Sequence, residues 1–335
     1  MGWKHVVRNT LNAGLTPYGY SVVSRSCLYD WQIGDVRSDI PQATLPEEVA
    51  SYLRLDNPRL LELQHRYEQV DSVVTAPVVW QDGLIGLEEM RSFRADNAYI
   101  WQQRGVGRLN YVLAAYYAKS VDRLGLLDRL EEDGAFGAYA IEIDGKPMGR
   151  DLLDSVLEIQ FLEDQLGLSA MKGLNVLDIG AGYGRLATRV AQALPFLDHY
   201  YCTDAVAVST FLCEYYVRYR GVSDKVSILP LDEVATRLAG KRIDLAVNIH
   251  SFSECSMSAV DWWFRLLSDL GVPNVLIAPN ATREGGARLC LNSGESFEST
   301  VEKHGYRVRT VSPKYADPAV AEYALYPTYY HLLER

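Results

Sequence analysis

A glycine-rich turn flanked by acidic residues has the residue types and spacing for ligand chemistry. An apolar run that contains Asp178 leads into a G-x-G-x-G pattern at residues 180–184, and a second acid, Asp204, follows twenty residues after that pattern. Glycines allow a turn to pass close to a ligand because no Cβ atoms stand in the way. The turn is followed by a helical pattern, so a helix N-terminus points at the same place. This arrangement predicts a site for a nucleotide-type ligand.

The glycine spacing and the acids indicate which ligand binds. A dinucleotide-binding turn has the pattern G-x-G-x-x-G, and its last glycine lets the helix pack beneath a pyrophosphate. Here the sixth position is Arg185, and Asp178 stands where a diphosphate would gain nothing. S-adenosylmethionine carries a sulfonium and an ammonium group and no phosphate, so an acid beside the turn suits it. We predict S-adenosylmethionine as the cofactor, with Asp204 accepting hydrogen bonds from both ribose hydroxyls.

Alternating strands and helices must hold these residues in place. A strand at 175–179, a helix whose apolar side carries Leu186 and Val190, and a strand at 199–203 form one βαβ unit. The rest of the pattern predicts helices at 211–219 and 259–270, and strands at 226–230, 243–250, 274–280, 306–311 and 329–333, the last two with no helix between them. The fold class is therefore α/β, with a Rossmann-like, mostly parallel sheet of seven strands and an antiparallel C-terminal hairpin.

Residues 1–149 precede this alternation and are predicted to be mainly helical. Residues 1–26 begin with a basic, amphipathic piece, which suits contact with a membrane surface or a partner, or simple docking of a terminus. Pro58 opens a helix that carries Leu60, Leu61, Leu63 and Tyr67. We predict two domains: 1–149, which contributes to the substrate pocket or to oligomerisation, and 150–335, which binds the cofactor.

Composition excludes several classes of function. The chain has 335 residues and a net charge of −10, with no basic cluster to bind nucleic-acid phosphates. No apolar run approaches the roughly 20 residues that span a bilayer, and no signal-peptide core is present. Five scattered cysteines without a C-x-x-C pair indicate neither a disulfide framework nor a zinc site. We expect a cytoplasmic protein with a small-molecule substrate and no nucleic-acid or membrane partner, and oligomerisation stays open.

The sequence motifs resemble those of a known group of enzymes. With VLDIGAGYGRLA and an acid ending the second strand, residues 150–335 resemble the class I S-adenosylmethionine-dependent methyltransferases. A narrower resemblance to the bacterial putative sugar O-methyltransferase family is carried by the glycine turn and by residues 93–99, 150–155 and 248–254. Cys255 departs from that family, in which methionine is expected. The resemblance implies methylation of a hydroxyl on a sugar or a sugar-bearing natural product.

His250 is the candidate catalytic base. It ends a predicted strand at the carboxyl edge of the sheet, where ligands bind in open α/β folds, and a histidine side chain titrates near neutral pH. A histidine satisfied by backbone groups at a strand end is the alternative. Glu254 would orient His250 or hold the sugar. Asp232, Glu254 and Asn280 are the oxygen ligands that a metal-assisted reaction would need, but we predict no metal.

Two further sets of residues are predicted to bind ligands. The cofactor set comprises Asp178, Gly180, Ala181, Gly182, Gly184, Arg185, Asp204, Ala205, Leu231, Asp232 and Asn248. The substrate set comprises Arg94, Asn97, Tyr99, Arg150, Asp151, Ser251 and Asn280.

Several members of the substrate set have an alternative interpretation. The polar stretch 91–99 either holds an Arg–Asp surface pair or lines a polar pocket. Asp151 is also a candidate helix cap. Arg150, Asp151 and Glu158 are either site residues or exposed helix charges.

Two other functions compete with O-methylation. An N-methyltransferase of an amino sugar would need no strong base, so replacing His250 would leave most of its activity. A non-catalytic scaffold protein would retain the cofactor fold, although the intact Asp178, glycines and Asp204 argue against it.

Overall fold

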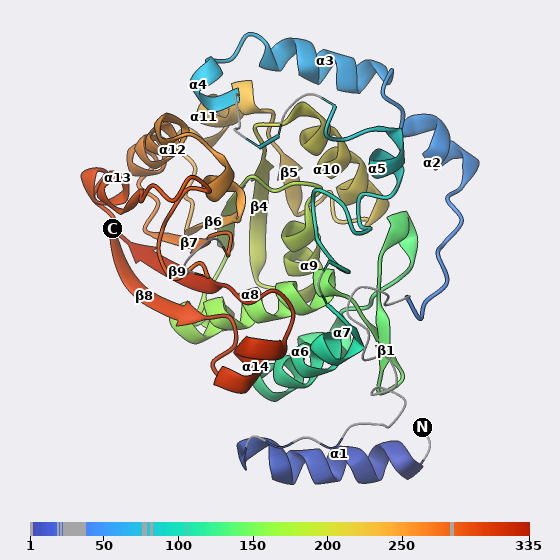
Figure 1. Ribbon diagram of the computed structural model, residues 1–335. Coiled ribbons are helices and arrows are strands. Elements are labelled where there is room, and N and C mark those ends of the chain that lie inside the picture. Colours follow the sequence, from blue (N-terminus) through green and yellow to red (C-terminus); the bar gives the residue numbers. More distant parts are fainter. Residues whose placement is uncertain are drawn as a thin grey trace. The chain divides into compact units, whose positions relative to one another are not determined.

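The chain forms two compact units, each assembled from separate stretches of sequence. The computed structural model describes residues 3–18, 20, 22, 38–75, 79–80, 83–104, 106–281 and 285–335 (Figure 1). The helical unit comprises Met1–Leu45, Ser92–Gln160 and Tyr315–Pro327. The sheet unit comprises Pro46–Arg91, Phe161–Lys314 and Thr328–Arg335.

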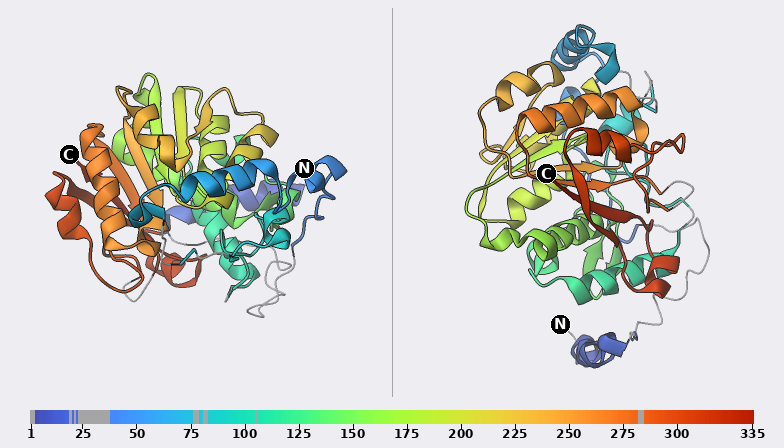
Figure 2. Two further views of the ribbon diagram at one scale, coloured as in Figure 1. Left: turned by 90° about the horizontal axis from the view of Figure 1, so that it is seen from above. Right: turned by 90° about the vertical axis from the view of Figure 1, so that its left-hand side faces the viewer.

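A seven-stranded sheet forms the centre of the sheet unit and has the order β5-β4-β3-β6-β7-β9-β8. The strands are β3 (Leu174–Ile179), β4 (Leu197–Thr203), β5 (Val226–Ile228), β6 (Leu245–Ile249), β7 (Asn274–Ala278), β8 (Arg307–Pro313) and β9 (Tyr329–Glu334). All neighbours pair in parallel except β9, which is antiparallel to both β7 and β8. Figure 2 shows the sheet from two further sides. The predicted fold class is confirmed.

Helices surround the sheet and build the other unit. Those of the sheet unit are α2 (Glu47–Tyr52), α3 (Pro58–Tyr67), α4 (Ser72–Thr75), α5 (Leu87–Arg91), α9 (Arg185–Ala193), α10 (Ala207–Tyr219), α11 (Val234–Leu238), α12 (Met257–Asp269) and α13 (Glu298–Lys303). The helical unit holds α1 (Trp3–Leu15), α6 (Arg108–Val121), α7 (Leu126–Arg129), α14 (Pro318–Tyr323) and the hairpin of β1 (Ile141–Ile143) and β2 (Lys146–Met148). The sequence of α8 (Arg150–Leu166) contributes to both units.

The glycine turn follows the central strand of the sheet. β3 is buried at every position and lies between β4 and β6, which explains its almost continuous apolar sequence. The chain proceeds from β3 to β5 towards one edge, and from β6 to β7 in the opposite direction. Ligands of open α/β sheets bind outside the carboxyl ends of the strands at such a reversal. A ligand site is therefore expected outside the ends of β3 and β6.

Two details differ from the sequence predictions. The units do not follow the predicted boundary at 149–150: residues 46–91 belong to the sheet unit, because α3 packs against α10 there. A helix, α14, separates β8 from β9, where none was predicted. Both differences depend on contacts between distant residues, which a local pattern does not reveal.

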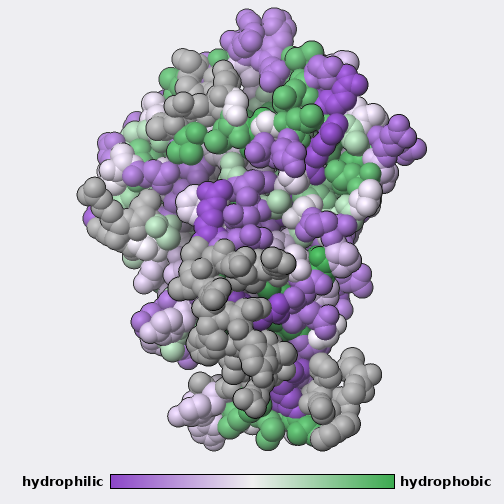
Figure 3. Space-filling model, turned by 45° about the vertical axis from the view of Figure 1, so that its right-hand side comes forward, coloured by the Kyte–Doolittle hydropathy of each residue, from purple (hydrophilic) through white to green (hydrophobic). Residues whose placement is uncertain are grey.

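Helix α1 has the amphipathic character that its sequence predicts. Val6, Val7 and Leu11 are all exposed, and apolar side chains of α1 gather at the bottom of Figure 3. Within the described part of the chain, no helix has the length and apolar character needed to cross a membrane.

Candidate functional site

The turn after β3 has no room for a side chain at two of its glycines, Gly180 and Gly184. Gly180, Gly182 and Gly184 all have positive φ angles, of 76°, 57° and 85°. A Cβ atom at Gly180 would stand 2.1 Å from Oγ of Ser251, and one at Gly184 would stand 2.8 Å from Sγ of Cys213. Glycine is therefore required at both positions for backbone conformation and for space. Arg185, the first residue of α9, is half-buried beside the turn.

Asp204 ties this turn to the end of β4. Its carboxylate accepts a hydrogen bond from the N–H of Gly182 at 2.9 Å and one from the N–H of Val206 at 2.8 Å. The N–H groups of Gly180 and Ala181 donate to the carbonyl of Thr203 at 2.9 and 3.1 Å. Ala205 is half-buried beside the acid. The turn and the acid are thus parts of one hydrogen-bonded structure.

The electrostatic environment of Asp204 leaves it ready to receive hydrogen-bond donors. Burial raises the pKa of Asp204 to about 7, an effect opposed by the two backbone N–H donors and reinforced by the negative charge of Glu254. Each carboxylate oxygen has a second lone pair, so two hydroxyl groups of a ligand can still bind. Such donors would stabilise the charged form of Asp204.

Two other predicted cofactor residues hold the site together. The hydroxyl of Tyr200 donates to Asp178 at 2.9 Å. The side-chain amide of Asn248, wholly buried, donates to the carbonyl of Ile179 at 2.8 Å and accepts from the N–H of Phe252 at 2.9 Å. Asn248 therefore fastens the end of β3 to the turn after β6, and its direct contact with a cofactor stays a prediction.

His250 has an unusual backbone conformation at the end of β6. Its φ and ψ angles are 70° and −31°. Its N–H donates to the carbonyl of Ala278 at 2.7 Å, and its own carbonyl accepts from the N–H of Ser253 at 3.1 Å. Non-glycine residues with positive φ cost of order 1–3 kcal/mol and are concentrated at functional sites. The half-buried side chain of His250 is therefore held at the predicted edge of the sheet.

Glu254, which follows His250 closely in the sequence, lies in a polar cluster with Trp80 and Asn280. One of its carboxylate oxygens accepts from the indole N–H of Trp80 at 2.6 Å, and the other accepts from the side-chain amide of Asn280 at 3.0 Å. Asn280 also contacts Oδ1 of Asn292 at 3.4 Å. This cluster places two predicted site residues together, whereas orientation of His250 by Glu254 stays a prediction.

No metal site emerges from this cluster. Among the residues with described positions, no group of three or more histidine, cysteine and acidic side chains is placed to hold a metal ion. The carboxylate of Asp232, one of the considered ligands, is paired with Arg66 at 2.8 Å.

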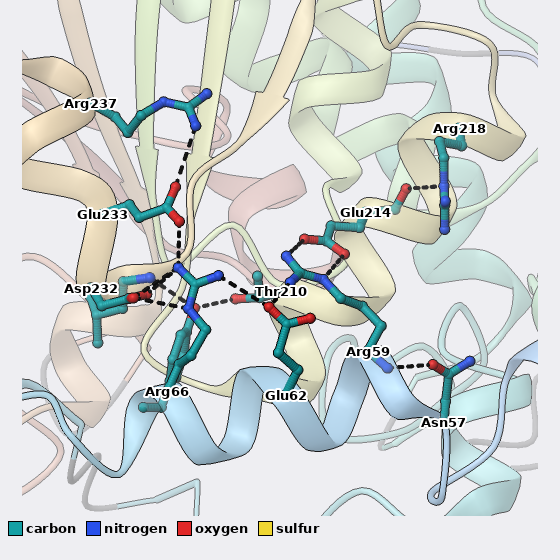
Figure 4. Close-up of polar contacts among 12 residues, drawn as sticks. Asn57, Arg59, Glu62, Arg66, Thr210, Glu214, Arg218, Asp232, Glu233 and Arg237 are labelled. Atoms are coloured by element: carbon teal, nitrogen blue, oxygen red, sulfur yellow. Dashed lines mark hydrogen bonds and ion pairs between the residues drawn. The ribbon is translucent and has the colours of Figure 1, made fainter.

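The end of β5 is covered by α3 (Figure 4). The guanidinium of Arg66 donates to both carboxylate oxygens of Asp232 at 2.9 Å. The hydroxyl of Tyr67 accepts from the N–H of Leu231 at 3.0 Å and is hydrogen-bonded to the hydroxyl of Thr210 at 2.8 Å. Burial raises the pKa of Tyr67 above its ordinary value, and the charges of Asp204 and Asp232 add to the shift. Two predicted cofactor residues, Leu231 and Asp232, therefore bond to α3.

Arg94 is a buried structural residue of the helical unit. Its side chain is 0% exposed and pairs with Asp133 at 2.7 Å, with Asp151 at 3.2 Å and with Glu132. The predicted surface pair is wrong because Arg94 reaches no solvent. Contact of Arg94 with a substrate stays a prediction, and its guanidinium is surrounded by carboxylates.

The other predicted residues of the helical unit are also bonded within it. Asp151 is not a cap but lies inside the first turn of α8. The guanidinium of Arg150 donates to Asp154 at 3.0 Å and to the carbonyl of Trp101 at 2.6 Å. Asn97, buried, donates to the carbonyl of Ser92 at 2.8 Å and accepts from the N–H of Tyr99 at 2.9 Å.

Burial also bears on the charged residues of α8 and on Tyr99. Arg150, Asp151 and Glu158 are all buried, so their interpretation as exposed helix charges is wrong. Tyr99 is half-buried. Substrate contacts of Asn97, Tyr99, Arg150 and Asp151 stay predictions.

Three residues of the site were missed in the sequence. Arg66, Tyr67 and Trp80 all come from residues 46–91, more than 100 residues before the strand ends that they contact. The pattern around Pro58 predicts that α3 is a helix, but nothing local shows what it contacts. Only the three-dimensional structure assigns these side chains to the site.

Comparison with known proteins finds no matching family model and no matching curated protein. Among solved structures, the chain is similar to a magnesium protoporphyrin IX methyltransferase from Synechocystis PCC 6803 with bound S-adenosylmethionine (12% identity, 56% of this chain and 83% of that chain, TM-score 0.39). It is similar to a methyltransferase from Aquifex aeolicus (18% identity, 52% and 89%, TM-score 0.39). It is also similar to the cyclase SpnF (17% identity, 56% and 82%, TM-score 0.40).

Proposed function

We propose that this protein transfers a methyl group from S-adenosylmethionine to a hydroxyl group of a sugar or a sugar-containing small molecule. The observation that carries the proposal is the joint structure of the glycine turn and Asp204 at the reversal of strand order. Gly180 has no space for a Cβ atom, and Asp204 is a buried acid whose hydrogen-bond partners are the backbone N–H groups of Gly182 and Val206. The class of substrate rests on the sequence resemblance alone.

These residues fit an adenosyl cofactor. A buried carboxylate with free lone pairs suits the two hydroxyls of a ribose, and both hydrogen bonds would offset the cost of its burial. The glycine turn admits a ligand against the backbone. When bound, the cofactor supplies a methyl group on a positively charged sulfur.

The residues at the end of β6 would act on the acceptor. His250 would accept the proton of the acceptor hydroxyl, and that oxygen would take the methyl group that the bound cofactor supplies. The products are a methyl ether, neutral S-adenosylhomocysteine and protonated His250. Glu254 and Asn280 are hydrogen-bonded to each other and would hold the acceptor's other hydroxyls. Positioning of this kind supplies up to about 7–11 kcal/mol in well-aligned reactions.

Two measurements test the proposed function in sequence. Calorimetry with S-adenosylhomocysteine should show binding, and no binding at millimolar ligand would overturn the proposal. Methyl transfer from labelled S-adenosylmethionine should then occur to members of a panel of glycosides and nucleotide sugars. Transfer to amino sugars only, at nitrogen, would replace O-methylation with N-methylation.

The role of His250 is tested by His250→Asn. Asparagine tolerates a positive φ, so this variant preserves the backbone better than alanine does. We expect kcat to fall by about 10²–10⁴ while the Kd for S-adenosylhomocysteine is unchanged, because the imidazole acts on the acceptor proton. A kcat near that of the wild type at neutral pH would show that His250 is a structural strand-end residue.

A further inference from the structure

Helix α3 ends on groups that the cofactor would use. Asn57 caps its N-terminus by accepting from the N–H of Arg59, and Pro58 occupies the first helical turn. At the other end, Arg66 and Tyr67 bond to the segment Leu231–Glu233 that follows β5 (Figure 4). The predicted cofactor residues Leu231 and Asp232 therefore already have partners, and these partners come from the N-terminal part of the chain.

Displacement of α3 by a ligand would cost free energy, because the helix would lose its buried contacts and ion pairs. Leu60, Leu63 and Tyr67 are all buried, and a displaced α3 would return their apolar surface to water. Two arginine–carboxylate pairs add to this attachment: Arg59 with Glu214 and Arg66 with Asp232. A helix fixed so firmly acts as a permanent wall of the site rather than as a gate.

The guanidinium of Arg66 binds both oxygens of the Asp232 carboxylate and so fixes its orientation. Two parallel N–H···O bonds fix the plane of the carboxylate and leave a lone pair on each oxygen free. Tyr67 fixes the backbone next to Asp232, because its hydroxyl is hydrogen-bonded both to the N–H of Leu231 and to the hydroxyl of Thr210 on α10. Together these bonds hold one acidic side chain in a single orientation at the end of β5.

We propose that Arg66 and Tyr67 are positioning residues that hold Asp232 to accept a hydrogen bond from the 6-amino group of the cofactor's adenine. This inference rests on the proposed function, because it assumes an adenosyl ligand in the sheet unit. It makes α3 a determinant of base specificity, although α3 lies more than 100 residues before the glycine turn in the sequence.

The test compares two ligands that differ only at the base. S-adenosylhomocysteine carries an amino group at position 6, and S-inosylhomocysteine carries a carbonyl, which a carboxylate repels. We expect the wild-type protein to prefer the adenosyl ligand by at least about tenfold in Kd, since a hydrogen bond to a charged group contributes this much. Arg66→Gln should reduce the preference to about threefold or less, and Arg66→Lys should restore part of it.

A matched control exists on the same helix. Arg59 forms an equivalent pair with Glu214, and the side chains of the two pairs are similarly exposed: 29% and 19% for Arg59 and Glu214, and 23% and 31% for Arg66 and Asp232. Arg59→Gln should therefore loosen α3 to a similar degree but keep the wild-type preference. Tyr67→Phe should also lower the preference for the adenosyl ligand, to about threefold or less, because the N–H of Leu231 loses its acceptor and the neighbouring Asp232 is held less firmly.

Each outcome is decisive for one of the two proposals. An unchanged preference in Arg66→Gln, or an equal loss in Arg59→Gln, would overturn the positioning role while the proposed function stands. A wild-type protein that binds neither ligand would overturn the proposed function itself.

Discussion

The ends of β4 and β5 each present an acid, but the protein treats the two acids differently. Asp204, after β4, is buried and is held by backbone N–H groups of the glycine turn. Asp232, after β5, is partly exposed and is held by the side chain of Arg66. Hydrogen bonds from a ligand would therefore stabilise the charged form of Asp204 most, whereas the positive charge of Arg66 already compensates that of Asp232. Under the proposed function, we expect most of the affinity for the cofactor at the end of β4 and the selectivity for its base at the end of β5.

The largest effect should come from the turn on which the β4 end depends. Gly180→Ala would place a Cβ atom 2.1 Å from Oγ of Ser251, at a φ of 76°. We expect S-adenosylhomocysteine binding to weaken by at least about 100-fold, because the turn must shift away from Asp204. Gly221→Ala is the control: its φ is 67°, but nothing lies within 4 Å of the added atom. Equal losses in both variants would show that strain, not space, limits the turn.

Neutralising each acid in turn tests the comparison directly. We expect Asp204→Asn to weaken S-adenosylhomocysteine binding by about tenfold or more, since a charged acceptor of two hydroxyl hydrogen bonds contributes about 1.5–3 kcal/mol. Asp232→Asn should have a smaller effect, because Arg66 already compensates the charge of Asp232. The opposite order, measured by calorimetry, would reverse the roles of the two strand ends.

The smallest effect concerns stability and pH in the absence of ligand. The pKa of Asp204 is raised from its ordinary value to about 7, so the folded protein holds this proton more tightly than the unfolded chain does. The resulting stabilisation is complete below the unfolded pKa and is lost as the pH rises through about 7. Urea unfolding should show a stability decline of at most about 4 kcal/mol from this group between pH 4 and 8. Asp204→Asn should lack this contribution, and an identical pH profile in that variant would contradict the assignment.

The sequence predicted the features that depend on neighbouring residues. The run before Gly180 is a buried strand, the glycines form a turn without Cβ atoms, and Asp204 follows the next strand. These features follow from a continuous apolar run, from the helical period of 3.6 residues and from the glycines themselves, all of which a short pattern records.

Features that depend on contacts between distant residues were not predictable. Arg94 was assigned to a surface or a pocket, yet it is enclosed by acids that lie 38 to 57 residues further along the chain. Tyr67 and Trp80 reach strand ends that no local pattern associates with them. The residues around a charged side chain are the same whether that side chain faces water or a buried carboxylate, so the local sequence does not reveal its partner.

The position of β9 in the sheet has a consequence for the order of folding. β8 precedes β9 in the chain, but among the described strands β8 pairs with β9 alone, and β9 lies between β8 and β7. Until residues 329–334 join the sheet, the strand at 307–313 therefore has no partner among the described strands, and its exposed backbone groups are open to pairing with another chain. Assembly of this edge must therefore wait for residues 329–334, however early the glycine turn and its central strands have folded.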